Sequence, residues 1–267
     1  MSRLKVVILS DLHLGPAGAA VNGLDPGARL AGAVEVINRD HADAACVLIA
    51  GDLADRGEVA AYAHLKDLLS PLRPPVHLTL GNHDDRAAFL SVFGAALDDP
   101  EGRVSRALDL GGYRLLLLDT SDAGLVGGRL CDGRRRWLVA RLAEAPDRPV
   151  IVVQHHHANP LSLPVDDIML EDGAAYLDIL SRHPDVRAVI AGHVHLPSAA
   201  VWRGVPMMTL AGSHYSVSPH VPGVPGPQRQ FEGPAQMAIL LADAEGVTVH
   251  FQDHSEWHLV LAPGLFD

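Results

Sequence analysis

The sequence has few cysteines and no long hydrophobic run. Its two cysteines, Cys46 and Cys131, are too few for a disulfide framework, and Cys46 lies in an apolar run that predicts a buried, inert thiol. No apolar run approaches the roughly 18–20 residues that span a bilayer. The apolar segment 6–9 is also too short for the core of a signal peptide, so no membrane association is expected. These absences favour a reducing, cytoplasmic location.

Positive charge is also scarce. The chain has 21 lysines and arginines against 32 aspartates and glutamates, which gives a formal net charge of −11. The only basic run, 134–136, has the pattern of the solvent-exposed first turns of a helix. Because nucleic-acid binding requires clustered positive charge, a nucleic-acid polymer is not expected as a partner.

Short apolar runs alternate with amphipathic segments through the first two thirds of the chain. Asp25-Pro26 is a typical helix start, and Gly111-Gly112 predicts a two-residue hairpin. Strands are expected at 4–9, 45–50, 76–80, 104–110, 113–118, 150–153 and 186–191, and helices at about 26–38, 58–69, 85–93, 134–145 and 172–182.

The last third is mostly β, with strands expected at 199–202, 205–210, 236–241, 247–252 and 257–261. Between them, residues 219–234 are rich in proline and glycine, which predicts a loop without regular structure that acts as a lid or an oligomer contact. We therefore expect one α/β domain over 1–267, with mixed β-sheets forming a two-layer sandwich core flanked by helices. Residues 199–267 would complete that core, and a homo-oligomer is expected.

Ligand-type side chains follow five of the expected strands. Gly192-His193-Val194-His195 comes directly after the strand at 186–191, and residues i and i+2 of an extended chain point to the same side. A lone His-x-His pair is weak evidence in a chain with 16 histidines. The other four strand ends carry Asp11 with His13, Asp52, Asn82 with His83, and His155.

These strand ends can converge, because ligands of α/β sheets gather beyond the carboxyl ends of the strands. Taken singly, each aspartate or asparagine is equally typical of a turn or a helix cap. Together they form a set of carboxylates, imidazoles and one amide without thiolate, which suits Mn, Fe, Zn or Co. The ligands suffice for two divalent transition-metal ions, and one carboxylate must then be shared between them.

The same residues form five short motifs. In chain order these are Asp11-Leu12-His13, Gly51-Asp52, Gly81-Asn82-His83-Asp84, His155-His156 and Gly192-His193-Val194-His195. Together they resemble the motifs of the calcineurin-like metallophosphoesterases, and the segments 51–57 and 81–86 resemble the bacterial class III cyclic-nucleotide and glycerophosphodiester phosphodiesterases. The resemblance covers roughly residues 5–210 and implies the metallo-dependent phosphatase fold.

The resemblance implies a role for each residue. The first metal would be held by Asp11, His13, Asp52 and His195, and the second by Asn82, His155 and His193, with Asp52 bridging the two. His83 would stabilise or protonate the leaving oxygen, and Asp84 would orient His83. A third histidine, His157, stands where relatives have a proline, so His156 remains an alternative to His155 as the ligand.

The resemblance further implies a dinuclear-metal phosphodiesterase acting on small substrates by attack of a metal-bound hydroxide. The expected substrates are 3′,5′-cyclic nucleotides such as cyclic AMP, or glycerophosphodiesters. A phosphomonoesterase, a 2′,3′-cyclic nucleotide phosphodiesterase and a non-catalytic metal-binding scaffold are the alternatives. Near the motifs only Arg56 and Arg86 carry positive charge, which disfavours a doubly charged monoester. Loops 14–24, 120–133, 157–170 and 213–234 are expected to select the substrate.

Overall fold

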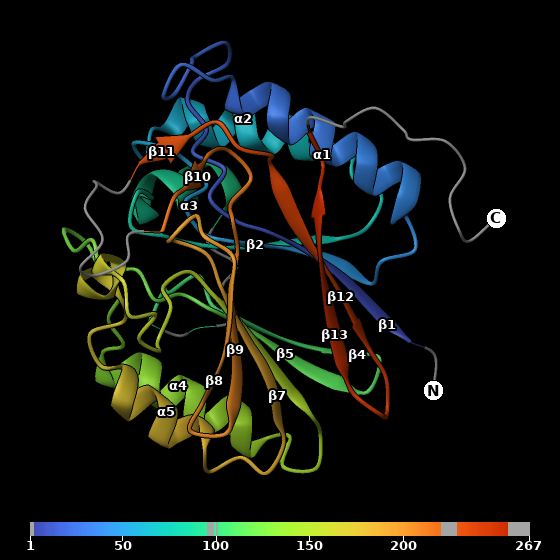
Figure 1. The fold of residues 1–267 in the computed structure, drawn as a ribbon, viewed down its shortest axis with the longest axis vertical. Helices are drawn as coiled ribbons and strands as arrows, with labels where there is room; N and C mark the ends of the chain where they lie inside the picture. The colour runs from blue at the N-terminus through green and yellow to red at the C-terminus, as the bar shows by residue number, and fades with distance from the viewer. Residues whose placement is uncertain (1–2, 95–98, 100, 220–228, 256–267) are drawn as a thin grey trace.

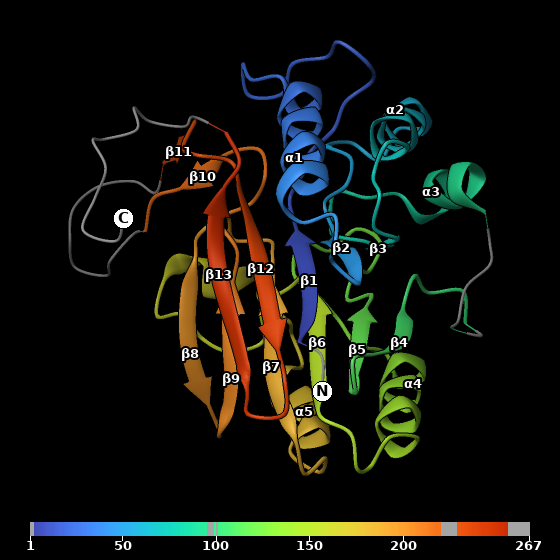
Figure 2. The same cartoon turned by 90° about the vertical axis from the view of Figure 1, so that its right-hand side faces the viewer.

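The computed structural model describes residues 3–94, 99, 101–219 and 229–255. Two β-sheets face each other, and helices cover their outer faces (Figures 1 and 2). The expected mixed two-layer sandwich flanked by helices is thereby confirmed. Among the described residues, no helix is long and apolar enough to cross a membrane.

The first sheet combines strands from both ends of the chain. Its members are β1 (Leu4–Leu9), β2 (Cys46–Ala50), β3 (Val76–Thr79), β12 (Gln236–Ala242) and β13 (Val247–Asp253), in the order β13-β12-β1-β2-β3. β1, β2 and β3 are parallel, whereas β12 runs antiparallel to β1. The carboxyl ends of β1, β2 and β3 therefore lie at one edge of the sheet.

The second sheet is also mixed. It consists of β4 (Arg106–Leu110), β5 (Tyr113–Leu118), β6 (Val150–Gln154), β7 (Val186–Ala191), β8 (Ser198–Trp202) and β9 (Val205–Thr209), in the order β4-β5-β6-β7-β9-β8. The four central strands are parallel, and β4 and β8 are antiparallel edge strands. Leu110 pairs with Tyr113 across the Gly111-Gly112 turn, which confirms the expected hairpin.

Alternating side chains hold the layers together. In β1, Val6 and Ile8 pack against the second sheet, whereas Val7 and Leu9 pack against helices, as the two-residue period of a strand requires. The first sheet is covered by α1 (Pro26–Asp40), α2 (Val59–Leu69) and α3 (Arg86–Phe93), and the second by α4 (Asp132–Ala143) and α5 (Gly173–Leu180). Cys46 is buried between the sheets as expected, and burial raises its pKa to about 12, which favours the neutral thiol.

The fold differs from the sequence predictions in two places. Arg134 is not solvent-exposed: it is fully buried, and its Nη1 donates to the carbonyls of Asp119 (3.2 Å) and Ser121 (2.7 Å). The segment 219–234, expected to lack regular structure, contains the short strand β11 (Gln230–Phe231), which pairs with β10 (Ser216–Val217). Residues 220–228 of that segment and the strand expected at 257–261 lie outside the described residues.

Candidate metal centre

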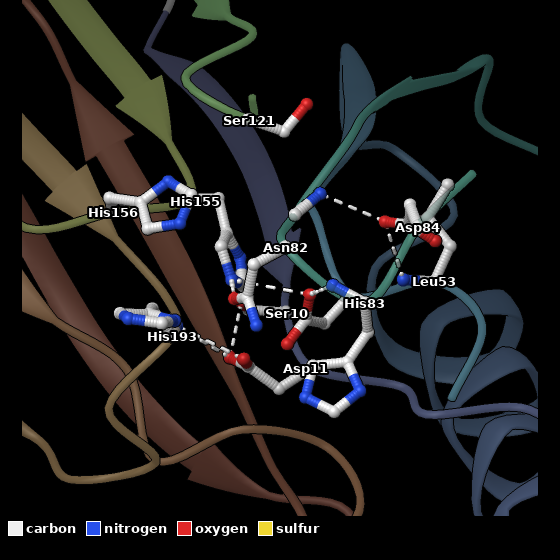
Figure 3. A network of polar contacts seen from close by, with 12 residues as sticks. Ser10, Asp11, Leu53, Asn82, His83, Asp84, Ser121, His155, His156 and His193 are labelled. Atoms are coloured by element: carbon white, nitrogen blue, oxygen red, sulfur yellow. Dashed lines mark hydrogen bonds and ion pairs between the residues drawn. The ribbon is translucent and has the colours of Figure 1, made fainter. Parts of the chain in front are cut away.

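The expected site residues follow five strands that come from both sheets. Asp11 and His13 follow β1, Asp52 follows β2, and Asn82 and His83 follow β3 in the first sheet. His155 follows β6, and His193 and His195 follow β7 in the second sheet. Figure 3 shows the side chains of Asp11, Asn82, His155 and His193 pointing toward a common centre. The centre thus lies where the carboxyl ends of strands from two sheets meet.

The backbone at these residues is strained. A positive φ costs a non-glycine residue on the order of 1–3 kcal/mol and is concentrated at functional sites. Eight described non-glycine residues have it, and five of them are expected metal ligands: Asp11, His13, Asp52, His193 and His195. The turns between strand and ligand also require glycine, because a Cβ on Gly81 would collide with the Asp52 carboxylate and one on Gly192 with the Ser10 hydroxyl.

One group of ligand atoms comes from Asp11, His13 and His195, whose donor atoms lie within 4.8 Å of one another. The two Nε2 atoms of His13 and His195 face each other at 3.1 Å, and His195 Nε2 lies 3.4 Å from Asp11 Oδ1. On its far side, the ring of His195 donates from Nδ1 to the Tyr215 carbonyl at 2.8 Å. This bond orients the ring and leaves Nε2 as the free nitrogen, as in most histidine metal sites.

A second group surrounds the other face of Asp52. His155 Nε2 lies 3.3 Å from Asp52 Oδ1 and 3.1 Å from Asn82 Oδ1, while its Nδ1 donates to the Ala50 carbonyl at 2.8 Å. His193 donates from Nε2 to the Ile168 carbonyl at 3.0 Å, which leaves its Nδ1 free. Both rings therefore have one nitrogen fixed by a carbonyl and one available for a metal.

Asp52 lies between the two groups and is almost fully buried. Its Oδ2 is 3.6 Å from His13 Nε2, and its Oδ1 is 3.3 Å from His155 Nε2. Each oxygen thus faces a different group of histidines, so the one carboxylate is in reach of both groups. The oxygen and nitrogen donors, with no thiolate among them, fit divalent ions.

The structure bears on the choice between His155 and His156. His156 Nδ1 is 2.8 Å from the Thr120 hydroxyl, and its Nε2 is 3.2 Å from the Val126 carbonyl. Both of its ring nitrogens are therefore engaged, although the ring lies beside His155 and His193. His155 keeps a nitrogen directed at Asp52, so the geometry favours His155 as the ligand.

The environment of His83 differs from the expectation in one respect. Its Nδ1 donates to the backbone carbonyl of Asp55 at 2.8 Å, so Asp55, and not Asp84, orients the ring. The Asp55 carboxylate in turn lies 3.3 Å from His13 Nδ1. The Asp84 carboxylate instead fixes the loop, because it accepts hydrogen bonds from the backbone N–H groups of Gly81, Leu53 and Ala54 and from the Tyr62 hydroxyl.

Sequence reasoning missed the role of Asp55, although Asp55 lies inside one of the motifs. Its position three residues after Asp52 places it near the centre. However, nothing in the sequence shows that its backbone carbonyl accepts a hydrogen bond from His83. Asp84 is displaced from the centre in Figure 3, on the side of the Leu53 backbone. Burial, together with the charge of Asp52, raises the pKa of Asp84 to about 6.

Metal binding is expected to release a proton from His155. Burial alone would lower its pKa, but the Asp52 charge and hydrogen bond raise the pKa to about 9 in the metal-free protein. A metal binds only the neutral ring, so affinity for the second ion should fall as the pH drops below about 9. Calorimetric titration with Mn²⁺ at pH 7 in buffers of different ionisation enthalpy measures this release. A binding enthalpy independent of the buffer would contradict it.

A pocket with a volume of about 470 Å³ opens over the centre and includes Asp52, Asn82, His83, His193 and His195 in its wall. Its other wall comes from three of the four loops expected to select the substrate. Loop 120–133 contributes Val126, loop 157–170 contributes Val165 and Ile168, and loop 213–234 contributes Tyr215, Val217, Arg229 and Gln230. The fourth loop, 14–24, lines a separate hollow with Asp55, Arg56 and Glu58, contrary to the expectation.

Residues 4–197 match the model of a family described as calcineurin-like phosphoesterase. A probable cyclic nucleotide phosphodiesterase of Rhodopseudomonas palustris is 35% identical over 257 residues, which cover 92% of this chain and 91% of the relative. A glycerophosphodiester phosphodiesterase of Enterobacter lignolyticus is 32% identical, with 78% of this chain and 77% of the relative covered. A dimetal phosphatase from Danio rerio has a similar fold, with a TM-score of 0.68, 17% identity, and coverage of 94% of this chain and 99% of its own.

Proposed function

Because this chain belongs to the calcineurin-like phosphoesterase family, we propose that it hydrolyses small phosphodiesters at a pair of divalent metal ions. The observation that carries the proposal is Asp52, whose two oxygens face two separate groups of histidine nitrogens. The relatives are named as phosphodiesterases of cyclic nucleotides or glycerophosphodiesters, which supports diesters over monoesters as substrates. We therefore propose 3′,5′-cyclic nucleotides such as cyclic AMP, or glycerophosphodiesters, as substrates.

Seven residues would hold the ions. When bound, the two ions would activate a water and offset the negative charge of the phosphoryl oxygens. The carbonyl partners of His155, His193 and His195 keep these rings in the orientation that metal binding needs. The first ion would be held by Asp11, His13, Asp52 and His195, and the second by Asp52, Asn82, His155 and His193.

His83 would act on the leaving group. Its Nδ1 is held by the Asp55 carbonyl and its backbone N–H donates to Asp52 Oδ1 at 3.0 Å, so the residue is fixed at two points. The ring lines the pocket, and its Nε2 is the nitrogen left to donate a proton to the leaving oxygen. General acid catalysis of this kind contributes about 10²–10⁴-fold.

Comparison of kcat/KM over a panel of substrates with added Mn²⁺ tests the proposal. The panel consists of cyclic AMP, a 2′,3′-cyclic nucleotide, glycerophosphocholine, bis-p-nitrophenyl phosphate and p-nitrophenyl phosphate. The expected result is that one of the first four exceeds the monoester, and that a chelator abolishes all turnover. Monoester turnover above that of every diester would reject the proposed substrate class.

We propose a single domain for residues 1–267, because β12 and β13 from the last part of the chain extend the sheet that begins with β1. A homo-oligomer, the lack of a nucleic-acid partner and a cytoplasmic location stay predictions from the sequence.

A further inference from the structure

The pocket wall opposite the metal centre carries an arginine, Arg229. Arg229 is the only lysine or arginine among the described residues of this pocket. Within the part of the chain that the structure describes, no residue forms an ion pair or a side-chain hydrogen bond with its guanidinium group. A guanidinium without a carboxylate partner is available for an anion, and its planar fork matches a carboxylate or phosphate.

The two arginines nearest the motifs in sequence are not available in this way. Arg86 Nη2 forms an ion pair with Asp119 Oδ2 at 2.8 Å, and Arg56 Nε lies 3.7 Å from Asp55 Oδ2. Neither lines the pocket over the metal centre. The positive charge that faces the substrate therefore comes from a residue remote in sequence from every motif.

The backbone of Arg229 is tied to a metal-ligand residue through a short series of hydrogen bonds. Val217 N–H donates to the His195 carbonyl at 3.0 Å, and the next residue, Ser218, donates from its N–H to the Arg229 carbonyl at 2.8 Å. Arg229 N–H donates back to the Ser218 hydroxyl at 3.0 Å. The paired strands β10 and β11 thus hold Arg229 at a fixed place relative to His195.

Apart from Tyr215 and Gln230, the rest of this wall is apolar. Val126, Val165, Ile168 and Val217 line it, so an alkyl or aromatic part of the substrate can pack there while its phosphoryl group lies at the metal centre. Arg229 lines the same pocket, so a substrate that extends along this wall can contact it. The wall therefore suits an alcohol with an apolar stem and a negatively charged end.

On the basis of the proposed function, we propose that Arg229 is a specificity residue that binds a second oxyanion, carried by the alcohol part of the phosphodiester. Among glycerophosphodiesters and other open-chain diesters, those whose alcohol bears a carboxylate or phosphate would then be preferred. Arg229 acts on substrate binding and has no part in the reaction at phosphorus, so its effect falls on KM and not on kcat.

The test compares two substrates that differ in one charge. Butyl p-nitrophenyl phosphate and 3-carboxypropyl p-nitrophenyl phosphate share a leaving group and a three-carbon stem, which ends in a methyl group in the first and a carboxylate in the second. The metal-loaded wild type should prefer the carboxylate by about 3–5-fold in kcat/KM, which is typical of a solvent-accessible ion pair. The preference should fall in 0.5 M NaCl, because salt screens exposed charges. A 3-phosphonopropyl ester shows whether phosphate is preferred to carboxylate.

Substitutions attribute the preference to Arg229. Arg229→Gln should abolish it through KM, and Arg229→Lys should keep part of it. Arg182→Gln removes the same charge from an arginine outside this pocket and should retain the wild-type preference. Equal rates for both substrates in the wild type, or an unchanged preference in Arg229→Gln, would overturn the inference alone. Hydrolysis of neither substrate by the metal-loaded wild type would instead reject the proposed function.

Discussion

Replacement of His83 with alanine is expected to leave two metal ions bound and to lower kcat for cyclic AMP or a glycerophosphodiester by about 10²–10⁴-fold. Metal content should be kept because the His83 ring contacts the Asp55 carbonyl and is not among the residues placed around either ion. Turnover should fall because the leaving alkoxide loses its proton donor. Metal analysis of the purified variant, together with steady-state kinetics, measures both effects.

Comparison of substrates with different leaving groups distinguishes a role of His83 as a proton donor from a purely structural role. p-Nitrophenolate departs without protonation, so His83→Ala should slow bis-p-nitrophenyl phosphate much less than it slows a diester with an alkyl leaving group. A structural role would lower both rates by the same factor. His250→Ala, which removes an exposed histidine from β13, is the matched control and should change neither rate. Equal losses for both substrates, or an unchanged kcat, would contradict the proton-donor role.

The layers of the fold could be predicted because each depends on local sequence. The run Val6–Leu9 is apolar at every position, which is typical of a strand buried on both faces, and the structure places sheet on one side and helices on the other. The helix start could also be predicted, because Asp25-Pro26 is a typical N-terminal pair. In the structure the Asp25 side chain accepts a hydrogen bond from Ala28 N–H at 3.0 Å. In contrast, the burial of Arg134 depends on carbonyls of the loop after β5, which no local pattern reports.

The convergence of the ligands could be predicted for a related reason. Asp52 follows a strand parallel to β1 in the first sheet, and His155 follows a strand parallel to β5 in the second, so each sheet delivers its ligand residues to one edge. The hydrogen bonds that orient the ligand histidines could not be predicted, because their acceptors are backbone carbonyls such as those of Ala50, Ile168 and Tyr215. Every residue has a carbonyl, so the sequence does not show which one orients a ring.

The same limit applies to the substrate wall. The loops 120–133, 157–170 and 213–234 were predicted to select the substrate, and each contributes to the pocket. The position of Arg229 depends on the pairing of β10 with β11, each of which is only two residues long. Strands that short leave no periodicity in a sequence, so a charge that lines the pocket could not be distinguished from one on a surface loop.

Replacement of Asp52 with asparagine is expected to have the largest effect of any single substitution, with loss of both ions and of turnover. The amide keeps the size of the side chain but removes the charge that faces His13 on one side and His155 on the other. Residues that merely orient a ligand contribute about 10–100-fold to metal affinity, so loss of a shared ligand should cost each ion at least about 100-fold. Metal analysis and activity with cyclic AMP measure these losses.

Thermal unfolding gives a readout of Asp52 that does not depend on turnover. A ligand at 100 times its dissociation constant stabilises a folded protein by about 2.7 kcal/mol, so Mn²⁺ should raise the Tm of the wild type above its value in chelator. Asp52→Asn should unfold at the same temperature with and without Mn²⁺. Asp43→Asn removes a charge from an exposed partner of Lys5 and should keep the wild-type response to metal. An Asp52→Asn protein that binds two ions and retains its turnover would show that the two histidine groups do not share a carboxylate.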